Sequence, residues 1–287
     1  MSLRYNDDQR LLADSARDFL AARSPVSAQR RLRDEAVALG FEPQLWRDAV
    51  ELGWSAIAFP EEFGGLDFGC KGLGPIFESM GRNLSATPLL SSVVLGGSLV
   101  QLAGNTAQKA QWLPALIGGE QRLALAVDER SRHDPSRIAL EAKAEGQGYR
   151  LHGDKFWVVD GLGADAYAVA ARTSGQPGET QGISLFLVPA DTPGLMVSAL
   201  PQIDSRNSAR LQLDQVQLGS DALLGSLGEG WAVLETALDR GRTCLAAELL
   251  GMAEQLFETT LEYLKTRVQF DTQIGTFQVL QHRAAQM

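Results

Sequence analysis

The sequence predicts an α+β protein of three parts: a helical part at residues 1–121, a β part at 122–225 and a second helical part at 226–287. Two observations predict this order. Apolar residues recur at helical spacing in both outer parts, whereas the period shifts to two between about Leu123 and Leu224. With 287 residues, 45% of them hydrophobic, the chain can form one large core or two to three small ones.

The first part is expected to form a series of helices. Asn6 and Gln9 have the spacing of a capping box, directly before an apolar stripe at helical spacing. Later helical patterns are expected to end at Gly53 and near Gly81, because glycine commonly ends helices. The segment QKAQWLPALIGGE predicts one more helix, which ends in a Gly-Gly turn.

The middle part is expected to be an antiparallel β-barrel or sandwich. Ile183, Leu185 and Leu187 alternate with the residues between them, as in a strand. The alternation in RLQLDQVQL slips by one at Asp214–Gln215, which indicates a β-bulge. Glycine-rich segments such as AEGQGY and TSGQPGETQG separate these runs and predict turns.

The third part predicts one long helix that begins near Glu235. Its expected apolar face consists of Leu249, Ala253, Leu256, Phe257, Thr260 and Leu264.

Composition excludes several classes of function. The net charge of −9, the pI near 4.9 and the absence of a Lys/Arg block predict no nucleic-acid partner. Cys70 and Cys244 lack metal or disulfide spacing, so we expect no metal and a cytoplasmic protein. The N-terminus lacks the apolar region of a signal peptide, and no apolar stretch is long enough for a membrane span.

General catalytic motifs do not identify a reaction. The three histidines, His133, His152 and His282, are widely separated, and GxSxG, Walker A and a GxGxxG after a strand are absent. The most unusual stretch is AVDERSRHDPS at 126–136, where charged residues directly follow an apolar strand. Its simplest interpretation is a solvated turn.

Several segments, in order along the whole chain, resemble the acyl-CoA dehydrogenase family. LGWSAIAFPEEFGGLDFG at 52–69 is similar to the family's Gly-Trp…Pro-Glu-Glu-Phe-Gly-Gly segment, and GDKFWVVDG at 153–161 to its Gly-x-Lys-x-Trp-Ile-Thr-Asn-Gly segment. The other matching segments are AQKAQWLPALIGGE, LDQVQLGSDALLG, LDRGRTCLAAELLG and TRVQFDTQIGTFQVLQHRAAQM. SATPLLSSVVLGG also resembles bacterial members that handle bulky acyl groups such as steroid side chains.

The resemblance implies an FAD-dependent oxidoreductase that places a double bond between Cα and Cβ of an acyl-CoA, in fatty acid or steroid catabolism. A carboxylate would remove the α-proton while a β-hydride passes to the flavin, and hydrogen bonds would polarise the thioester carbonyl. The resemblance also implies a homo- or hetero-oligomer, dimer or tetramer, because FAD sites of the family are shared between subunits. An electron-transfer flavoprotein is the implied electron acceptor.

The cofactor roles that the resemblance implies fall on two groups of residues. Val127, Asp128, Trp157 and Val159 stand where the family contacts its own flavin, although Trp157 has equal claim to be a core aromatic. Val159 replaces a threonine whose hydroxyl bonds near flavin N5. The second group matches residues that reach the FAD of a partner subunit, where an arginine fork suits a diphosphate. These residues are Arg267, Phe270 and Gln278.

The substrate roles that the resemblance implies fall on the first helix of the third part. Asp239 and Arg242 match polar residues near the acyl-CoA thioester, although an Asp-Arg pair at this spacing is also an ordinary helix surface pair. One of the two family positions for the catalytic base aligns with Gly241, which cannot act as a base. The other family position belongs to a segment after Met287. The catalytic base is therefore unknown.

The charged stretch is the second departure from the family pattern. The family has Thr-Glu-Pro-Gly-x-Gly-Ser-Asp here, which presents backbone amides and a serine hydroxyl to the flavin and its phosphates. In this chain only Glu129 keeps its place, Asp128 replaces the threonine and His133 replaces a glycine. A carboxylate at 128 would repel the pyrimidine or the diphosphate unless Arg130 or Arg132 offsets its charge.

Three hypotheses remain open. The first is an acyl-CoA dehydrogenase with a divergent flavin loop. The second is a non-catalytic subunit of a heteromeric acyl-CoA dehydrogenase, which lends residues to a neighbour's FAD and binds its own poorly. The third is an acyl-CoA-binding protein without redox activity.

Overall fold

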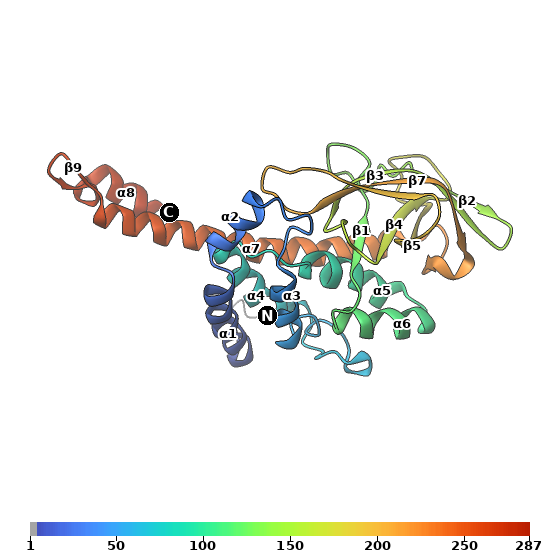
Figure 1. Cartoon of the computed structure of the whole chain (residues 1–287), viewed down its shortest axis with the longest axis horizontal. Helices are drawn as coiled ribbons and strands as arrows, with labels where there is room; N and C mark the ends of the chain where they lie inside the picture. Colours follow the sequence, from blue (N-terminus) through green and yellow to red (C-terminus); the bar gives the residue numbers. More distant parts are fainter. Residues whose placement is uncertain (1–4) are drawn as a thin grey trace.

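The computed structural model describes residues 5–287, and its three parts follow one another in the predicted order of helices, sheet and helices (Figure 1). The helical first part ends with α6, the β part follows, and the long helix α7 returns along the whole molecule. The helices of the first part are α1 (Asp7–Arg23), α2 (Val26–Asp34), α3 (Pro43–Glu51), the short η1 (Glu61–Phe63), α4 (Cys70–Asn83), the π-helix η2 (Leu89–Gly97), α5 (Ser98–Ala103) and α6 (Thr106–Ile117).

Two helix signals that the sequence gives in the first part are confirmed. The Asn6 side chain accepts the Gln9 amide at 2.8 Å, and the Gln9 side chain accepts the Asn6 amide at 3.0 Å, which is the predicted capping box of α1. Helix α6 ends before Gly118 and Gly119, and Gly119 adopts a φ of +68°, where glycine is favoured.

The β part is one eight-stranded sheet in the order β6-β7-β3-β2-β4-β5-β8, with β1 beside β4. Within residues 5–287 this order is an open path and does not close into a barrel. Most neighbours are antiparallel as predicted, but β1 and β2 both run parallel to β4. The strands are β1 (Leu123–Ala126), β2 (Glu141–Glu145), β3 (Gly148–Val159), β4 (Ala166–Arg172), β5 (Ile183–Pro189), β6 (Leu195–Ala199), β7 (Ser208–Gly219) and β8 (Leu223–Leu224), with the short η3 (Ser220–Ala222) before β8.

Two bulges interrupt the pairing of β3 with β7. The predicted bulge at Asp214–Gln215 is confirmed, because Leu151 pairs with Val216 and Gly153 pairs with Leu213. The second bulge lies on β3 between Lys155 and Val158 and was not predicted. It contains Trp157, whose φ of +57° is uncommon for a bulky residue.

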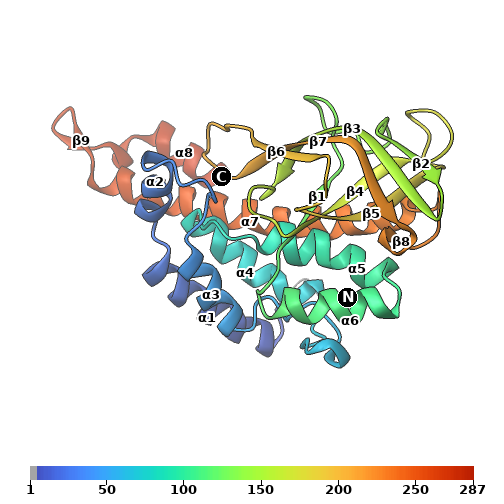
Figure 2. The same ribbon diagram turned by 45° about the vertical axis from the view of Figure 1, so that its right-hand side comes forward.

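Helix α7 (Trp231–Thr266) lies between the sheet and helices α4–α6 in both ribbon views (Figures 1 and 2). It begins earlier than predicted, and its packed face differs from the predicted one. Leu249 and Leu256 of the predicted face are about 60% exposed. The face that α7 buries consists of five residues, of which only Leu234 is large and apolar, so this face carries little hydrophobic signal. These residues are Leu234, Ala237, Gly241, Cys244 and Gly251.

The chain ends in a small hairpin and a short helix that extend away from the body (Figure 1). These elements are β9 (Val268–Gln269), β10 (Thr272–Gln273), η4 (Ile274–Thr276) and α8 (Gln278–Gln286). No helix in residues 5–287 has the length and hydropathy of a membrane span.

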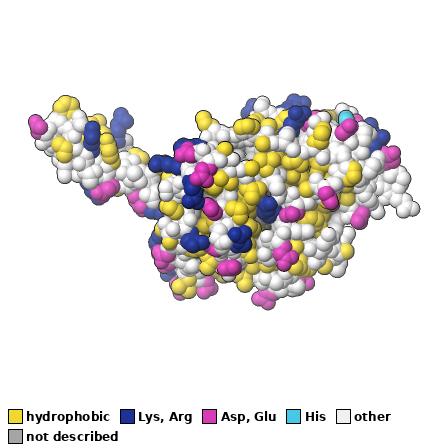
Figure 3. Space-filling view, in the orientation of Figure 1, with side chains coloured by type: hydrophobic (Ala, Val, Ile, Leu, Met, Phe, Trp, Pro, Cys, Tyr) yellow, Lys and Arg dark blue, Asp and Glu magenta, His cyan; other side chains and the backbone are white. Residues whose placement is uncertain are grey.

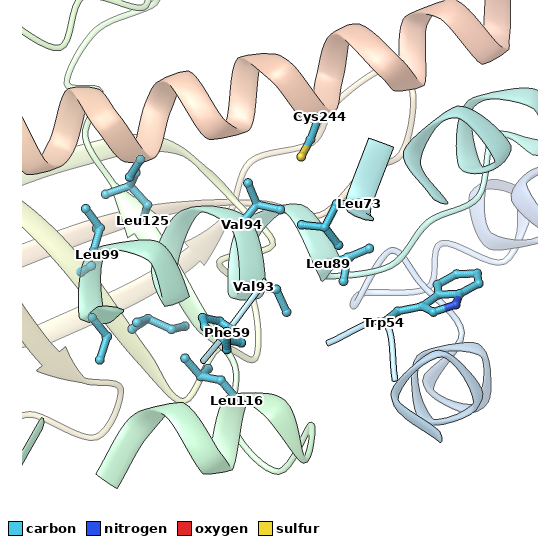
Figure 4. Close-up of a cluster of buried hydrophobic side chains, with 14 of the residues drawn as sticks. Trp54, Phe59, Leu73, Leu89, Val93, Val94, Leu99, Leu116, Leu125 and Cys244 are labelled. Carbon is cyan, nitrogen blue, oxygen red and sulfur yellow. The ribbon is translucent and has the colours of Figure 1, made fainter. Parts of the chain in front are cut away.

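One hydrophobic core joins the first part, β1, β4, β5 and α7, and a second core lies within the sheet. Figure 4 shows the first core, where Cys244 of α7 points toward Val94 of η2 and Leu125 of β1 lies beside Leu99. Because β1 and α7 share this core, the end of β1 is held against α7 and η2, where the candidate site lies.

Candidate functional site

A cavity of about 320 Å³ lies where the end of β1, the bulge of β3, η2 and α7 meet. Leu90, Leu95, Leu125, Leu238 and Leu245 give it an apolar wall. Most of the candidate site residues predicted from the sequence also line this cavity. These positions are Val127, Asp128, Trp157, Val159, Gly241 and Arg242.

Trp157 and Val159 present apolar surface to this cavity. Their side chains are 40% and 41% exposed, and both lie at the bulged end of β3. Because the bulge adds a residue to β3 there, the direction of the side chains changes and Trp157 stays outside the sheet core. The alternative interpretation of Trp157 as a core aromatic is therefore wrong.

The charged loop after β1 is built around two carboxylates with different partners. Asp128 contacts His133 Nδ1 at 2.9 Å and accepts the Asp134 amide at 3.3 Å. His133 thus contacts Asp128, and neither Arg130 nor Arg132 forms an ion pair with Asp128 in the described chain. Arg130 is exposed.

Glu129 and Lys155 were missed as a pair by sequence reasoning. Lys155 is fully buried, and its ammonium donates to Glu129 at 2.7 Å and to the carbonyl of Val127 at 2.9 Å. Burial lowers the pKa of Lys155, and the Glu129 carboxylate opposes that change. Glu129 also accepts the amides of Ala139 and Leu140, so it joins the two ends of the loop. The sequence feature that could have indicated this pair is Lys155 itself, a charged residue next to the apolar end of a strand.

Helix α7 supplies the opposite wall of the cavity. Gly241 faces the cavity without a side chain, and a Cβ there would lie 2.7 Å from Leu95 Cδ2. Arg242 donates to Asp239 at 2.6 Å and to Glu235 at 2.7 Å. Asp239 is exposed and is not part of the cavity wall, so within the described chain it orients Arg242.

The remaining cofactor positions lie elsewhere. Arg267, Phe270 and Gln278 belong to the hairpin and helix that extend from the body, and none of them lines the cavity (Figure 1). The Phe270 side chain is 89% exposed and packs against Phe277, with 6.3 Å between ring centroids.

A second, larger cavity of about 620 Å³ adjoins the first and was not predicted. The two cavities share Leu90, Val159 and Leu245 in their walls. In Figure 3 hydrophobic side chains gather over the middle of the molecule, between the β part and the helices below, with charged side chains beside them around α2. No group of three or more potential metal-ligating side chains was found in residues 5–287.

The carboxyl group of Asp160, in this larger cavity, makes the stability of the protein depend on pH. Burial raises the pKa of Asp160 from 3.8 to about 6, although Ser91 donates to its carboxylate at 2.6 Å. Between these two pH values the folded protein holds a proton that the unfolded chain has released, so stability falls as the pH rises. Asp160→Asn keeps an acceptor for Ser91 and cannot titrate. We expect the variant to gain thermal stability relative to wild type as the pH rises from 4 to 7.

Unfolding temperatures of wild type and Asp160→Asn, measured across this pH range, test the prediction. Asp165→Asn, at an exposed carboxylate on the same part of the chain, provides the control. A difference between wild type and Asp160→Asn that does not change with pH would contradict the assignment.

Comparison with known proteins identifies the family. The N-terminal, middle and C-terminal domain families of acyl-CoA dehydrogenase match residues 6–120, 125–216 and 228–287. Mitochondrial isovaleryl-CoA dehydrogenase of Pongo abelii is 30% identical over 98% of this chain and 68% of its own length. The chain belongs to the acyl-CoA dehydrogenase family.

Other members of the family are similar in sequence and in fold. Acyl-CoA dehydrogenase FadE27 of Mycobacterium tuberculosis is 32% identical over 85% of this chain and 62% of its own length. The crystal structure of the ChsE4-ChsE5 complex from the same species superposes with a TM-score of 0.86 at 28% identity, over all of this chain and 74% of that one. The chain thus spans about two thirds of the length of the curated relatives.

Proposed function

We propose that this chain belongs to an FAD-dependent acyl-CoA dehydrogenase, which forms a Cα–Cβ double bond in an acyl-CoA thioester. One observation carries the proposal. The bulged end of β3 and the N-terminal third of α7 place Trp157 and Val159 in the wall of the same apolar cavity as Gly241 and Arg242. The residues that resemble the family's flavin and thioester positions therefore converge in space, although about eighty residues separate them along the chain.

The cavity wall fits the ring system of FAD. Trp157 and Val159 leave large apolar surfaces facing the cavity, and a flat aromatic ring would cover them. Asp128 is the least favourable neighbour for a flavin, but His133 already contacts it. We propose that Val127, Asp128, Trp157 and Val159 hold the flavin, which when bound supplies the acceptor for the β-hydride.

The chain's own groups would act by position and by exclusion of water. The leucines of the wall keep the reacting carbons in an apolar medium, which strengthens every electrostatic contact there. Arg242 is held by Asp239 and Glu235 beside the cavity, and we assign it to the thioester end of the substrate. Gly241 lets Leu95 pack closely against α7 and supplies no base.

Three features favour the second hypothesis, a non-catalytic subunit of a heteromeric enzyme. The base position on α7 is Gly241, and the flavin loop carries the Asp128–His133 contact where the family has small residues. Arg267, Phe270 and Gln278 project from the body, as residues that reach a partner's FAD would. The proposed function also includes assembly as a dimer or tetramer and an electron-transfer flavoprotein as the electron acceptor. It further includes a role in fatty acid or steroid catabolism and a cytoplasmic location.

Visible absorption of the purified chain separates the hypotheses. The dehydrogenase hypothesis predicts a yellow protein with close to one flavin per chain, which some acyl-CoA bleaches by reduction. Trp157→Ala should release flavin because it removes a ring from the cavity wall, whereas Trp231→Phe, outside that wall, should retain it.

The other outcomes have distinct meanings. A colourless protein that becomes yellow only with a co-expressed partner supports the non-catalytic subunit. A colourless protein that binds acyl-CoA without any partner supports the third hypothesis, an acyl-CoA-binding protein.

A further inference from the structure

Arg210 of β7 lies opposite the bulge of β3 that carries Trp157. The strands pair regularly on both sides of this bulge, but within it Phe156 and Trp157 together face Arg210 alone. Two residues opposite one define a β-bulge, and bulges commonly redirect a side chain beside a functional site. Arg210 is therefore placed where it can act on the residue that lines the smaller cavity.

The bulge decides which face of the sheet Trp157 occupies. Side chains alternate along a regular strand, so Trp157 would point to the same face as the fully buried Lys155, two residues earlier. The extra residue reverses this alternation. Val158 is buried instead, and Trp157 and Val159 are exposed toward the cavity. This part of the cavity wall thus depends on the bulge.

The bulge holds Trp157 in a strained backbone conformation. Its φ of +57° lies in the left-handed region, which is unfavourable for a bulky side chain. Such a conformation persists only where surrounding contacts hold it. One of these contacts is made by the backbone, because the amide of Phe156 donates to the carbonyl of Asp128 at 2.7 Å.

Arg210 adds a side-chain contact from the opposite strand. Its guanidinium lies over the ring of Phe156, 5.0 Å from the ring centre. Its Nε and Nη2 both donate to Oδ1 of Asp154, at 3.1 Å and 2.8 Å. A planar guanidinium can stack on a ring and bind a carboxylate at the same time. Arg210 therefore joins the regular strand before the bulge to the first residue within it.

We propose that Arg210 is a positioning residue, which holds the bulge so that Trp157 stays in the cavity wall. The inference rests on the proposed function, in which this wall faces the flavin. The side chains of Arg210 and Asp154 are 40% and 38% exposed, so their ion pair adds little to overall stability. The effect of Arg210 is on the local conformation of Phe156 and Trp157.

Fluorine NMR of the intact protein labelled with 5-fluorotryptophan tests the inference. The chain has five tryptophans, and the signal that disappears in Trp157→Phe belongs to Trp157. Arg210→Met keeps an unbranched stem and removes the guanidinium. We expect it to shift or broaden the Trp157 signal and to leave the other tryptophan signals in place. Phe156→Leu removes the ring below the guanidinium and should change the same signal.

Arg150→Met is the matched control. Arg150 also lies on β3, contacts Glu145 at 3.0 Å and has a side chain that is 38% exposed, but it lies outside the bulge. This variant should keep every tryptophan signal. Titration with FAD of protein freed of bound flavin gives a second measurement. Arg210→Met should bind FAD about three- to tenfold more weakly than wild type, as for one weakened aromatic contact, and Arg150→Met should bind it equally.

Three results would overturn the inference while the proposed function stands. They are an unchanged Trp157 signal in Arg210→Met, a change of all tryptophan signals in that variant, and equal binding of FAD to that variant and wild type. If Arg210→Met does not fold, Phe156→Leu decides by the same criteria. If the Trp157 signal responds but no form of the protein binds FAD, alone or with a co-expressed partner, the proposed function fails and the positioning of Trp157 by Arg210 remains.

Discussion

Glu129→Ala is expected to lower the free energy of unfolding by about 3–5 kcal/mol, the usual cost of removing one partner from a buried ion pair. The Lys155 ammonium is fully buried, and Glu129 is its only carboxylate partner within hydrogen-bond distance in the described chain. The variant also leaves the amides of Ala139 and Leu140 without their acceptor. Chemical denaturation followed by circular dichroism measures the loss.

A double variant provides the control for this prediction. Glu129→Gln combined with Lys155→Met removes both charges, keeps one carbonyl oxygen as an acceptor for one of the two amides and replaces the lysine stem with an apolar chain of similar length. It should recover most of the stability lost in Glu129→Ala, because no isolated charge remains buried. If the double variant is as unstable as Glu129→Ala, the ion pair is not the cause of the loss.

The same ion pair bears on the candidate site. Glu129 joins the two ends of the loop that carries Asp128 and His133, and Lys155 directly precedes the bulge that carries Trp157. The amide of Phe156, within that bulge, donates to the carbonyl of Asp128 at 2.7 Å. Loss of Glu129 should therefore also lower the amount of bound flavin, even at temperatures where the protein stays folded.

Gly251→Ala is expected to destabilise the protein by about 3 kcal/mol or more, at the upper end of overpacking effects. A Cβ at Gly251 would lie 1.8 Å from the carbonyl oxygen of Glu78, and a Cβ at Gly81 would lie 1.8 Å from that of Glu248. The two glycines thus let the backbones of α4 and α7 approach each other closely. Because the clashing atoms belong to the backbone, the two helices must separate to admit even a methyl group.

Gly74→Ala on α4 is the matched control. The nearest atom to a Cβ there is Tyr5 Oη at 3.9 Å, so the methyl group has space. Alanine favours the helix by about 1 kcal/mol over glycine, and this variant should be stable or slightly stabilised. Unfolding temperatures of both variants decide the matter, and equal effects at positions 74 and 251 would contradict close packing as the reason for Gly251.

Local patterns along the chain were enough for the order of the three parts and for several details. The Asn6–Gln9 capping box, the Gly-Gly end of α6 and the bulge at Asp214–Gln215 all depend on neighbouring residues, and all are confirmed. The family resemblance likewise rested on short ordered segments, and the matching domain families confirm it.

Features that depend on distant residues escaped the sequence. The predicted packed face of α7 contains larger residues such as Leu249 and is wrong. The observed packed face contains Gly251, which lets α4 approach closely but adds no apolar side chain to the sequence pattern. The second bulge, which lies on β3, was not predicted. It is defined by the pairing of β3 with β7, and the composition of GDKFWVVDG does not indicate it.

The sequence by itself determined the order of the three parts and the family, because these follow from local periodicity and ordered motifs, and it supplied the candidate residues for a flavin and a thioester. Only the tertiary structure decided which of these residues meet. It brought Trp157 and Val159 to Gly241 and Arg242, left Arg267, Phe270 and Gln278 apart, and placed Arg210 opposite the bulge that carries Trp157. Such contacts depend on the docking of α7 between sheet and helices, which is set by a shared core and by glycines far apart in the chain.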